Sequence, residues 1–196
     1  MKIVVTGPGA GPACGGGTMN EDNALVRIEE LSDAAQLNVV EELARKIFPR
    51  TYADLIPAEQ IPYMMRLMYD DAVLRKEFGS GVKFALITDA GIPVGYISWH
   101  LTDTGGGKIM RLEKLYLDYS RHGRSIGNMG IRYVIDAAKR TDAVCITLNV
   151  HKRNFRAQKA YCRAGFYRWR SEKEDVGSGF FKDDYVMRLD ILPRGE

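Results

Sequence analysis

The sequence predicts an α+β fold (mixed α/β), in which helices accompany a mostly antiparallel sheet. Short runs with apolar residues at alternate positions indicate about seven strands, and apolar residues at helical spacing indicate about four helices. Two strand-to-helix units follow each other in the second half of the chain, and two further strands close it. A chain of 196 residues, 45% of them hydrophobic, fits a single domain with a buried core and a twisted central sheet.

The N-terminal half of the domain is expected to hold one strand followed by two helices. The strand covers 25–28, and Ser32 is the candidate N-cap of a helix whose apolar face runs through Ile47. Pro49 is expected to end this helix because proline lacks the backbone N–H. The second helix is expected to begin at 57–60.

The rest of the domain is expected to contain the other strands and helices. Two strands at 83–88 and 94–101 are expected to form a hairpin through the turn 89–93. The remaining elements, in chain order, are a strand at 109–117, a helix at 126–140, a strand at 143–150, a helix at 154–164, and closing strands at 166–171 and 185–191.

The N-terminal segment differs in composition from the rest of the chain. Residues 1–23 are rich in Gly and Pro and are expected to form a flexible leader before a single domain at 24–193. An alternative is a strand at 2–5 followed by a phosphate-binding loop within 7–17, as in a nucleotide-binding protein. No amphipathic helix follows these glycines, and because such a loop needs one, the alternative is disfavoured.

Charge, hydrophobic runs and cysteines exclude several classes of protein. The net charge of +3 suits an anionic small ligand, and without a block of Lys or Arg we expect no nucleic-acid partner. No apolar run approaches the roughly 20 residues that span a bilayer, so no membrane partner is expected. Cys14, Cys145 and Cys162 are odd in number and irregularly spaced, which predicts no disulfide framework, no metal site and a cytoplasmic location.

A glycine-containing basic turn is the first candidate site. The apolar run 115–117 leads into the turn 122–127, His-Gly-Arg-Ser-Ile-Gly, which continues directly into an amphipathic helix. Glycine lets the backbone approach a ligand, and amides at a helix N-terminus attract phosphate. We therefore expect main-chain amides between Arg121 and Asn128 to bind a diphosphate. An ordinary surface turn with exposed arginines explains the pattern equally well.

Three further side chains are candidates for chemistry. Asn154 and Tyr161 are seven residues apart, close to two helical turns, so both are expected to project from one helical face. Asn154 is then a polar ligand contact or a helix cap, and Tyr161 is a proton donor or a core residue. Glu113 lies within a strand, where a carboxylate is uncommon, and is either a proton acceptor or solvent-exposed.

These constellations, in this order, resemble the GCN5-related N-acetyltransferase (GNAT) superfamily. The acetyl-CoA motif of that family, Arg/Gln-x-x-Gly-x-Gly/Ala between a strand and a helix, aligns without a gap on 122–127. The next unit of the family, Asn-x-x-Ala-x-x-x-Tyr-x-x-x-Gly-Phe, is matched by Asn154, Ala157, Tyr161, Gly165 and Phe166. The resemblance extends over roughly 25–192.

The resemblance implies a GNAT-like fold and an enzyme that transfers the acetyl group of acetyl-CoA to an amine without a metal. In that family pattern Glu113 is the candidate base, Tyr161 the acid that protonates the leaving thiolate, and an amide near Leu117 the oxyanion donor. The cofactor-binding residues that it implies are Leu115, Tyr116, Leu117, His122, Gly123, Arg124, Ser125, Ile126, Gly127, Asn128 and Asn154.

Two residues depart from the family pattern. His122 stands where Arg or Gln is usual, and Ser125 stands where the first motif Gly is usual. The backbone amide of Ser125 remains available, and its hydroxyl is a candidate donor to a phosphate oxygen. We expect a serine to be tolerated here if the position already has helical backbone angles, where it is also a good cap. These departures favour the alternative of a non-catalytic domain of the same fold that binds acyl-CoA as a sensor or interaction module.

The acceptor is less strongly indicated. The segments 51–65 and 112–117 resemble, more loosely, the PaiA-like branch of polyamine acetyltransferases, so the expected acceptor is a small-molecule amine such as a polyamine. The acidic residues Asp54, Glu59, Asp70 and Asp71 form either a polycation site or a solvated face. An exposed strand edge near the C-terminus is compatible with a homodimer.

Overall fold

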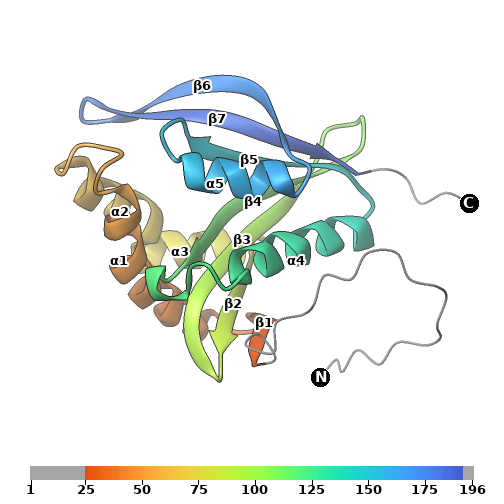
Figure 1. The fold of residues 1–196 in the computed structure, drawn as a ribbon, viewed down its shortest axis with the longest axis horizontal. Coiled ribbons are helices and arrows are strands. Elements are labelled where there is room, and N and C mark those ends of the chain that lie inside the picture. The colour runs from red at the N-terminus through yellow and green to blue at the C-terminus, as the bar shows by residue number, and fades with distance from the viewer. Residues whose placement is uncertain (1–24, 192–196) are drawn as a thin grey trace, which may run out of the picture.

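The computed structural model describes residues 25–191, in which one twisted sheet carries α-helices on both faces (Figure 1). The strands are β1 (Val26–Glu30), β2 (Lys83–Asp89), β3 (Ile92–Asp103), β4 (Lys108–Leu117), β5 (Ala143–His151), β6 (Tyr167–Gly177) and β7 (Phe180–Asp190). Their order across the seven-stranded sheet is β1-β2-β3-β4-β5-β7-β6, and β4 and β5 are the one parallel pair among the described strands. The expected mixed α/β class with a mostly antiparallel sheet is confirmed.

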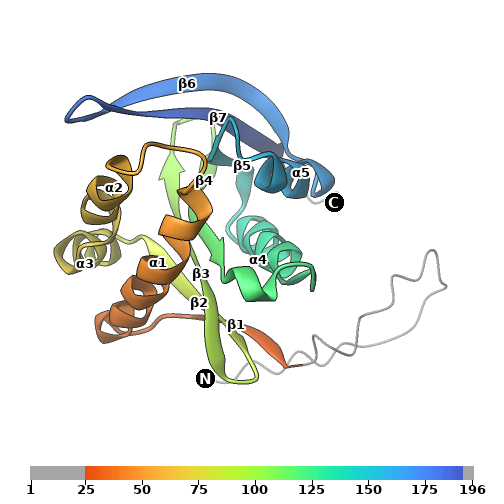
Figure 2. The same cartoon turned by 60° about the vertical axis from the view of Figure 1, so that its left-hand side comes forward.

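The helices divide between the two faces of the sheet. They are α1 (Leu37–Tyr52), α2 (Gln60–Tyr69), α3 (Asp71–Gly79), α4 (Ile126–Arg140) and α5 (Phe155–Arg163). Figure 2 shows α1, α2 and α3 on one side of the sheet and α4 and α5 on the other. Each face of the sheet has its own hydrophobic core, and successive residues of β2 point to opposite faces. Phe84 packs into the core on the α1 side, and Ala85 packs into the core on the α4 side.

The first helix differs from the expectation at both ends. Asp33, not Ser32, provides the cap: its side chain accepts from the Ala35 amide and forms a capping box with Gln36 before a short 3-10 turn. Pro49 lies inside α1, which continues to Tyr52. The helix gives up one backbone hydrogen bond at Pro49, and Tyr52, three residues later, still packs as a partly buried side chain against the same core.

The region between α1 and β2 contains two helices where one was expected. Asp70 has extended backbone angles (φ −58°, ψ 141°) and separates α2 from α3. The closing strands are also longer than expected, because β6 and β7 form an extended hairpin that turns at residues 178–179. Because β6 is mostly exposed and polar, the alternation of apolar residues did not indicate its full length.

The hairpin of β6 and β7 reaches from the sheet to α2, as both cartoon views show (Figures 1 and 2). The Gln60 Nε2 donates to the Phe181 carbonyl at 2.8 Å, and the Tyr63 hydroxyl donates to the Val176 carbonyl. The Tyr63 and Phe180 rings are 5.2 Å apart. We call these α2 contacts the hairpin clasp.

Two local features of β4 shape the centre of the molecule. Ser98 pairs with Lys114 and Trp99 pairs with Leu112, so Glu113 is an extra residue, a β-bulge, in β4. The parallel pairing of β4 with β5 ends at Leu112 and Leu148. Beyond this point the two strands separate, and the gap between them opens toward the turn that precedes α4.

Two sequence expectations lie outside the described residues, namely the leader at 1–23 and the phosphate loop within 7–17. Among the described helices, none combines the length and the apolar character that are needed to cross a membrane.

Candidate active site

A cavity of about 380 Å³ lies where β4 and β5 separate, between the turn before α4 and the helix α5. It collects almost all of the side chains and turns that the sequence singled out. Those that line it are Glu113, Leu115, Tyr116, Leu117, His122, Gly123, Ser125, Ile126, Gly127, Asn128, Asn154 and Tyr161. Arg124 is the exception and does not line the cavity.

The backbone of the turn determines which amides can reach a ligand. The amides of Arg121, His122 and Asn128 already donate to the carbonyls of Asp118, Tyr119 and Ser125. The set of amides that can bind a diphosphate is therefore smaller than the sequence suggested. Within residues 25–191, the amides of Gly123, Ser125, Ile126 and Gly127 have no protein acceptor. Donors of this kind at the start of a fifteen-residue helix favour an anion.

The conformation of Ser125 does not meet the condition of helical backbone angles under which a serine is expected to be tolerated. Its backbone is left-handed (φ 61°, ψ 5°), and its side chain makes no capping hydrogen bond. The family pattern has glycine here because glycine adopts this conformation without a steric penalty. The serine therefore places a strained backbone and a hydroxyl beside the cavity.

Replacing this serine by glycine is expected to stabilise the protein. Relief of the left-handed strain in Ser125→Gly should raise the free energy of unfolding by about 1 kcal/mol, or the melting temperature by about 2–4 °C. Thermal unfolding without ligand measures the effect. Ser171→Gly, in the extended strand β6, is the control and should lower the melting temperature. A loss of stability in Ser125→Gly would show that the hydroxyl makes a compensating contact.

His122 connects the end of β4 to α5. Its Nε2 lies 3.0 Å from the Leu117 carbonyl, and its Nδ1 contacts the Arg156 guanidinium. Burial, together with the positive charge of Arg156, lowers the pKa of His122, so the imidazole is neutral at physiological pH. A neutral ring that donates through Nε2 and accepts through Nδ1 explains both contacts.

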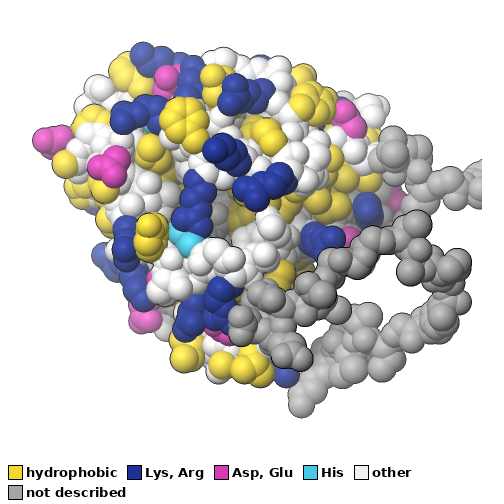
Figure 3. All heavy atoms as spheres, viewed as in Figure 1, with side chains coloured by type: hydrophobic (Ala, Val, Ile, Leu, Met, Phe, Trp, Pro, Cys, Tyr) yellow, Lys and Arg dark blue, Asp and Glu magenta, His cyan; other side chains and the backbone are white. Residues whose placement is uncertain are grey.

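The cationic contribution comes from residues other than His122. Arg121, Arg156 and Arg163 line the cavity. Figure 3 shows Lys and Arg side chains gathered on this face of the molecule. Arg156 and Arg163 are seven residues apart on α5, and this helical spacing is the sequence signal that could have identified them.

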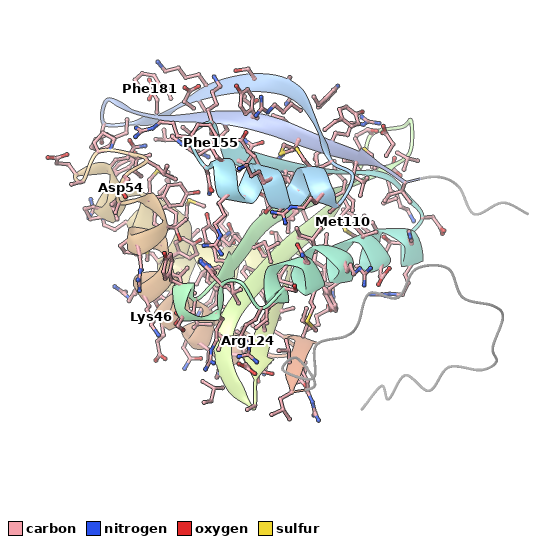
Figure 4. All side chains as sticks on the ribbon, viewed as in Figure 1. Lys46, Asp54, Met110, Arg124, Phe155 and Phe181 are labelled. Atoms are coloured by element: carbon pink, nitrogen blue, oxygen red, sulfur yellow. The ribbon has the colours of Figure 1, made fainter. Side chains whose placement is uncertain are left out.

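The Arg124 side chain points to a structural partner. Its Nη1 lies 2.6 Å from Asp89 Oδ2 at the end of β2, and the Arg121 Nη1 lies 3.2 Å from the same oxygen. Figure 4 shows Arg124 beside the start of α4, at the end of the molecule where β2 and β3 turn. Arg124 thus anchors the turn, and its guanidinium does not contribute to the cavity wall.

Asn154 and Tyr161 line the same cavity, as their spacing predicts. Asn154 is the N-cap of α5, where its Oδ1 accepts from the Ala157 amide at 3.1 Å. Tyr161 is buried, and its hydroxyl makes no hydrogen bond within the described part of the chain. Burial raises the pKa of Tyr161, so the phenol keeps its proton at neutral pH.

The separated strands leave a backbone donor at the centre of the site. The Asp118 amide donates to the Val94 carbonyl of β3 at 2.7 Å. Since successive residues of an antiparallel strand alternate in direction, the Leu117 amide is directed to the other side, into the gap toward β5. Leu117 also lines the cavity, so this amide is available to a carbonyl oxygen placed there.

A second, smaller cavity of about 90 Å³ adjoins the first. The two share Tyr52, Glu113, Tyr116 and Asn149, so they meet at the bulge of β4. The Glu113 carboxylate is one-third exposed, and its Oε1 lies 3.5 Å from both His100 Nδ1 and Arg111 Nε. Glu113 therefore faces both cavities and is not simply directed to bulk solvent.

The acidic residues considered for polycation binding do not line the smaller cavity. These residues are Asp54, Glu59, Asp70 and Asp71. Asp71 pairs with Arg75 at 2.8 Å, and Figure 4 shows Asp54 in the loop after α1. The charged and polar residues that do line it, and that the sequence did not single out, are Gln60, Arg111, Asn149, His151, Lys182 and Asp184. No metal-binding group of His, Cys, Asp and Glu is found within residues 25–191.

Comparisons with known proteins agree with this geometry. Among solved structures, the chain is similar to the PaiA N-acetyltransferase from Thermoplasma acidophilum in complex with coenzyme A, at 20% identity over 85% of this chain and 99% of that chain, with a TM-score of 0.68. It is also similar to the ribosomal-protein-S18-alanine N-acetyltransferase from Escherichia coli, at 14% identity over 87% and 97% of the two chains, with a TM-score of 0.65. No curated protein matches in sequence.

These structural likenesses, at such low identity, show the fold. The model of the acetyltransferase (GNAT) family matches residues 38–166, which is more than half of the chain and includes the turn before α4 and the whole of α5. The chain therefore belongs to the acetyltransferase (GNAT) family.

Proposed function

We propose that this protein transfers the acetyl group of acetyl-CoA to the primary amine of a small molecule. The observation that carries the proposal is the meeting of two cavities at the separated strands, with Glu113 at their junction. The larger cavity offers unpaired amides and arginines to an anion, and the smaller one offers room for an acceptor. The family match and the coenzyme A in a structural neighbour support this assignment.

The residues of the larger cavity fit coenzyme A. The unpaired amides of Gly123, Ser125, Ile126 and Gly127 would hold its diphosphate, and Arg156 adds positive charge beside them. The apolar walls from the end of β4 suit its uncharged arm. No metal is needed for this binding, because amides and guanidinium groups satisfy the phosphate oxygens.

Each step of the transfer has a candidate group on this chain. Acetyl-CoA supplies a thioester, in which the bond from the carbonyl carbon to sulfur breaks as the bond to the amine nitrogen forms. Glu113, directly or through water, accepts the proton that an alkylammonium of pKa about 10.4 must lose. The Leu117 amide donates to the carbonyl oxygen, and Tyr161 gives a proton to the thiolate.

The role of Glu113 predicts a changed pH dependence. Glu113→Gln should lower kcat/KM at neutral pH by about 10²-fold, because the variant cannot accept the ammonium proton. The rate should recover as pH rises toward the pKa of the free amine. The kcat/KM of the variant should therefore keep increasing in the pH range in which that of the wild type is constant. Rates from pH 6 to 10 measure this, with Glu41→Gln on α1 as control. An unchanged profile would return Glu113 to a purely structural role.

A second candidate function is a non-catalytic acyl-CoA sensor of the same fold. The observation that favours it is the strained Ser125 at the cavity, together with a neutral His122 where the family has Arg or Gln. Stabilisation by acetyl-CoA is expected of both functions. Release of the CoA thiol in the presence of spermidine, short diamines, amino acids or a lysine peptide separates them, because a sensor releases none.

We propose a polyamine or a similar small amine as the acceptor. Support comes from the likeness to the PaiA N-acetyltransferase and from the carboxylates Glu113 and Asp184 in the smaller cavity. We also propose a cytoplasmic location, which suits the free thiols of Cys145 and Cys162.

We propose a homodimer through the exposed edge of β6. If two copies of β6 pair in antiparallel register about Ser171, Arg170 faces Glu172 and Arg168 faces Glu174 of the other copy. Exposed edges of this length usually require a partner or protection. Sedimentation velocity of the wild type tests this, and a monomer at micromolar concentration would exclude it.

A further inference from the structure

The smaller cavity has an uneven lining that goes beyond a general acceptor pocket. Apolar and aromatic side chains form part of its wall, among them Phe48, Ile56, Met64, Met68 and Phe181, and charged or polar side chains form the rest. One end meets the larger cavity at Glu113. Asp184 of β7 lies on its wall and does not line the larger cavity, so the smaller cavity holds a carboxylate away from the junction with the larger one.

The Asp184 carboxylate is buried and unpaired. The residue is 8% exposed, and within residues 25–191 no hydrogen bond or ion pair reaches its side chain. Its neighbour Asp183 shows the usual arrangement, because it is half exposed and pairs with Lys152. A buried carboxylate without a partner is costly unless something positive meets it. Burial accordingly raises the pKa of Asp184 to about 6.

The nearby cations are committed to other carboxylates. Lys182 lines the cavity, but its Nζ lies 2.8 Å from Glu174 Oε2. Arg111 lies 3.5 Å from Glu113. The other groups near Asp184 are the carboxylates Asp183, Glu172 and Glu174, His151 of β5 and the Tyr52 hydroxyl of α1, none of which is a strong cation at neutral pH.

A second unpaired acceptor lies where the cavities meet. The Asn149 Nδ2 donates to Glu172 at 3.3 Å, which fixes the orientation of the amide. The Asn149 Oδ1 is then buried without a donor, and Asn149 lines both cavities. An ammonium or amine N–H at the junction would satisfy this oxygen.

We propose that Asp184 is a specificity-determining residue that binds a second positive group of the acceptor, so that the acceptor is a short diamine or a compound that ends like one. One nitrogen lies at the junction beside Glu113 and Asn149, and the other meets Asp184. The proposal rests on the acetyl-transfer function above, and it names the acceptor class for that site.

The hairpin clasp limits the size of this acceptor. Gln60 and Phe181 both line the cavity, and the hydrogen bond between them spans its wall. Together with the contacts of Tyr63, this bond holds the hairpin against α2 beside the cavity. At about 90 Å³ the cavity is much smaller than the adjoining one of about 380 Å³, and this difference favours a short acceptor.

The test compares 1,4-diaminobutane with n-butylamine, which lacks the second ammonium. In wild type, kcat/KM for the diamine should exceed that for butylamine by about 10- to 100-fold, the range for a hydrogen bond to a charged group. In Asp184→Asn the ratio should fall to about 1. Asp183→Asn, on the same strand but paired at the surface, should keep the wild-type ratio.

A binding measurement separates this inference from the proposed function. Calorimetry of both amines with the CoA-saturated protein should show tighter diamine binding in wild type and no preference in Asp184→Asn. Diamine binding of this pattern without turnover would contradict the proposed function and leave the subsite standing. Turnover with equal ratios in wild type and Asp184→Asn would overturn the subsite alone, as would a preference for an amino acid or peptide acceptor.

Discussion

Tyr161→Phe is expected to lower turnover by about 10²–10⁴-fold, the usual contribution of a well-placed general acid. The affinity for acetyl-CoA should change little, because the phenol acts on the leaving thiolate and not on the bound ground state. The fold should also tolerate the change, since no described residue hydrogen-bonds the Tyr161 hydroxyl and the ring contact with Phe166 at 5.6 Å remains. Steady-state kinetics and calorimetry with acetyl-CoA measure the two effects.

The matched control is Tyr133→Phe on α4. Tyr133 is a partly buried phenol that packs against Trp99 and does not line the cavity. Its replacement should leave kcat within about twofold of wild type, as expected for a change away from the reacting atoms. If both variants keep full turnover, a water or the thiolate itself completes the reaction, and Tyr161 belongs to the packing of α5.

The fold could be predicted well where one hydrophobic period dominates. The alternation around Phe84 and the helical spacing in α4 indicate the correct elements, and the glycine turn indicates where α4 begins. The predicted ends of helices were wrong where tertiary packing outweighed the local sequence signal. Pro49 is a helix breaker by its chemistry, but α1 continues to Tyr52, whose partly buried ring packs against the same core.

The cofactor side of the site was also accessible from the sequence, because it is built from short continuous segments. The turn before α4 and the N-terminus of α5 each place their backbone by local geometry. Ser125 shows the limit of this inference, since the residue type suggested a cap and the backbone is left-handed. The position of a turn residue can be predicted more easily than its torsion angles.

The acceptor side could not be predicted, because it is assembled from distant segments. Tyr52, Asn149 and Asp184 come from α1, β5 and β7 and meet only in the folded chain. The bulge at Glu113 also has no clear sequence signal. It shifts the alternation of β4, so that Leu112 and Leu115 face the same core and Glu113 reaches the junction of the cavities.

Asp184→Asn is expected to stabilise the unliganded protein at pH 7.5 by about 2–3 kcal/mol. The folded pKa of about 6 lies above the ordinary aspartate pKa of 3.8, so the charged form is disfavoured in the folded state. Wild type therefore loses stability as pH rises from about 4 to about 6, and the deficit persists above that range. The asparagine variant avoids the deficit, so the two proteins should converge in stability near pH 4. Urea unfolding from pH 4 to 8 measures the difference.

Asp183→Asn provides the opposite expectation on the same strand. Its hydrogen bond with Lys152 lowers the pKa of Asp183, so its replacement should bring no gain at pH 7.5. A carboxylate that weakens the free protein and has no protein partner is what a ligand site requires, because the missing cation arrives with the ligand. Saturation with 1,4-diaminobutane should therefore restore most of the free energy of unfolding that wild type lacks at pH 7.5, and it should leave the stability of Asp184→Asn unchanged. Equal unfolding curves for wild type and Asp184→Asn at every pH would mean that Asp184 is solvated or paired in solution, and the charge argument for a diamine would be lost with it.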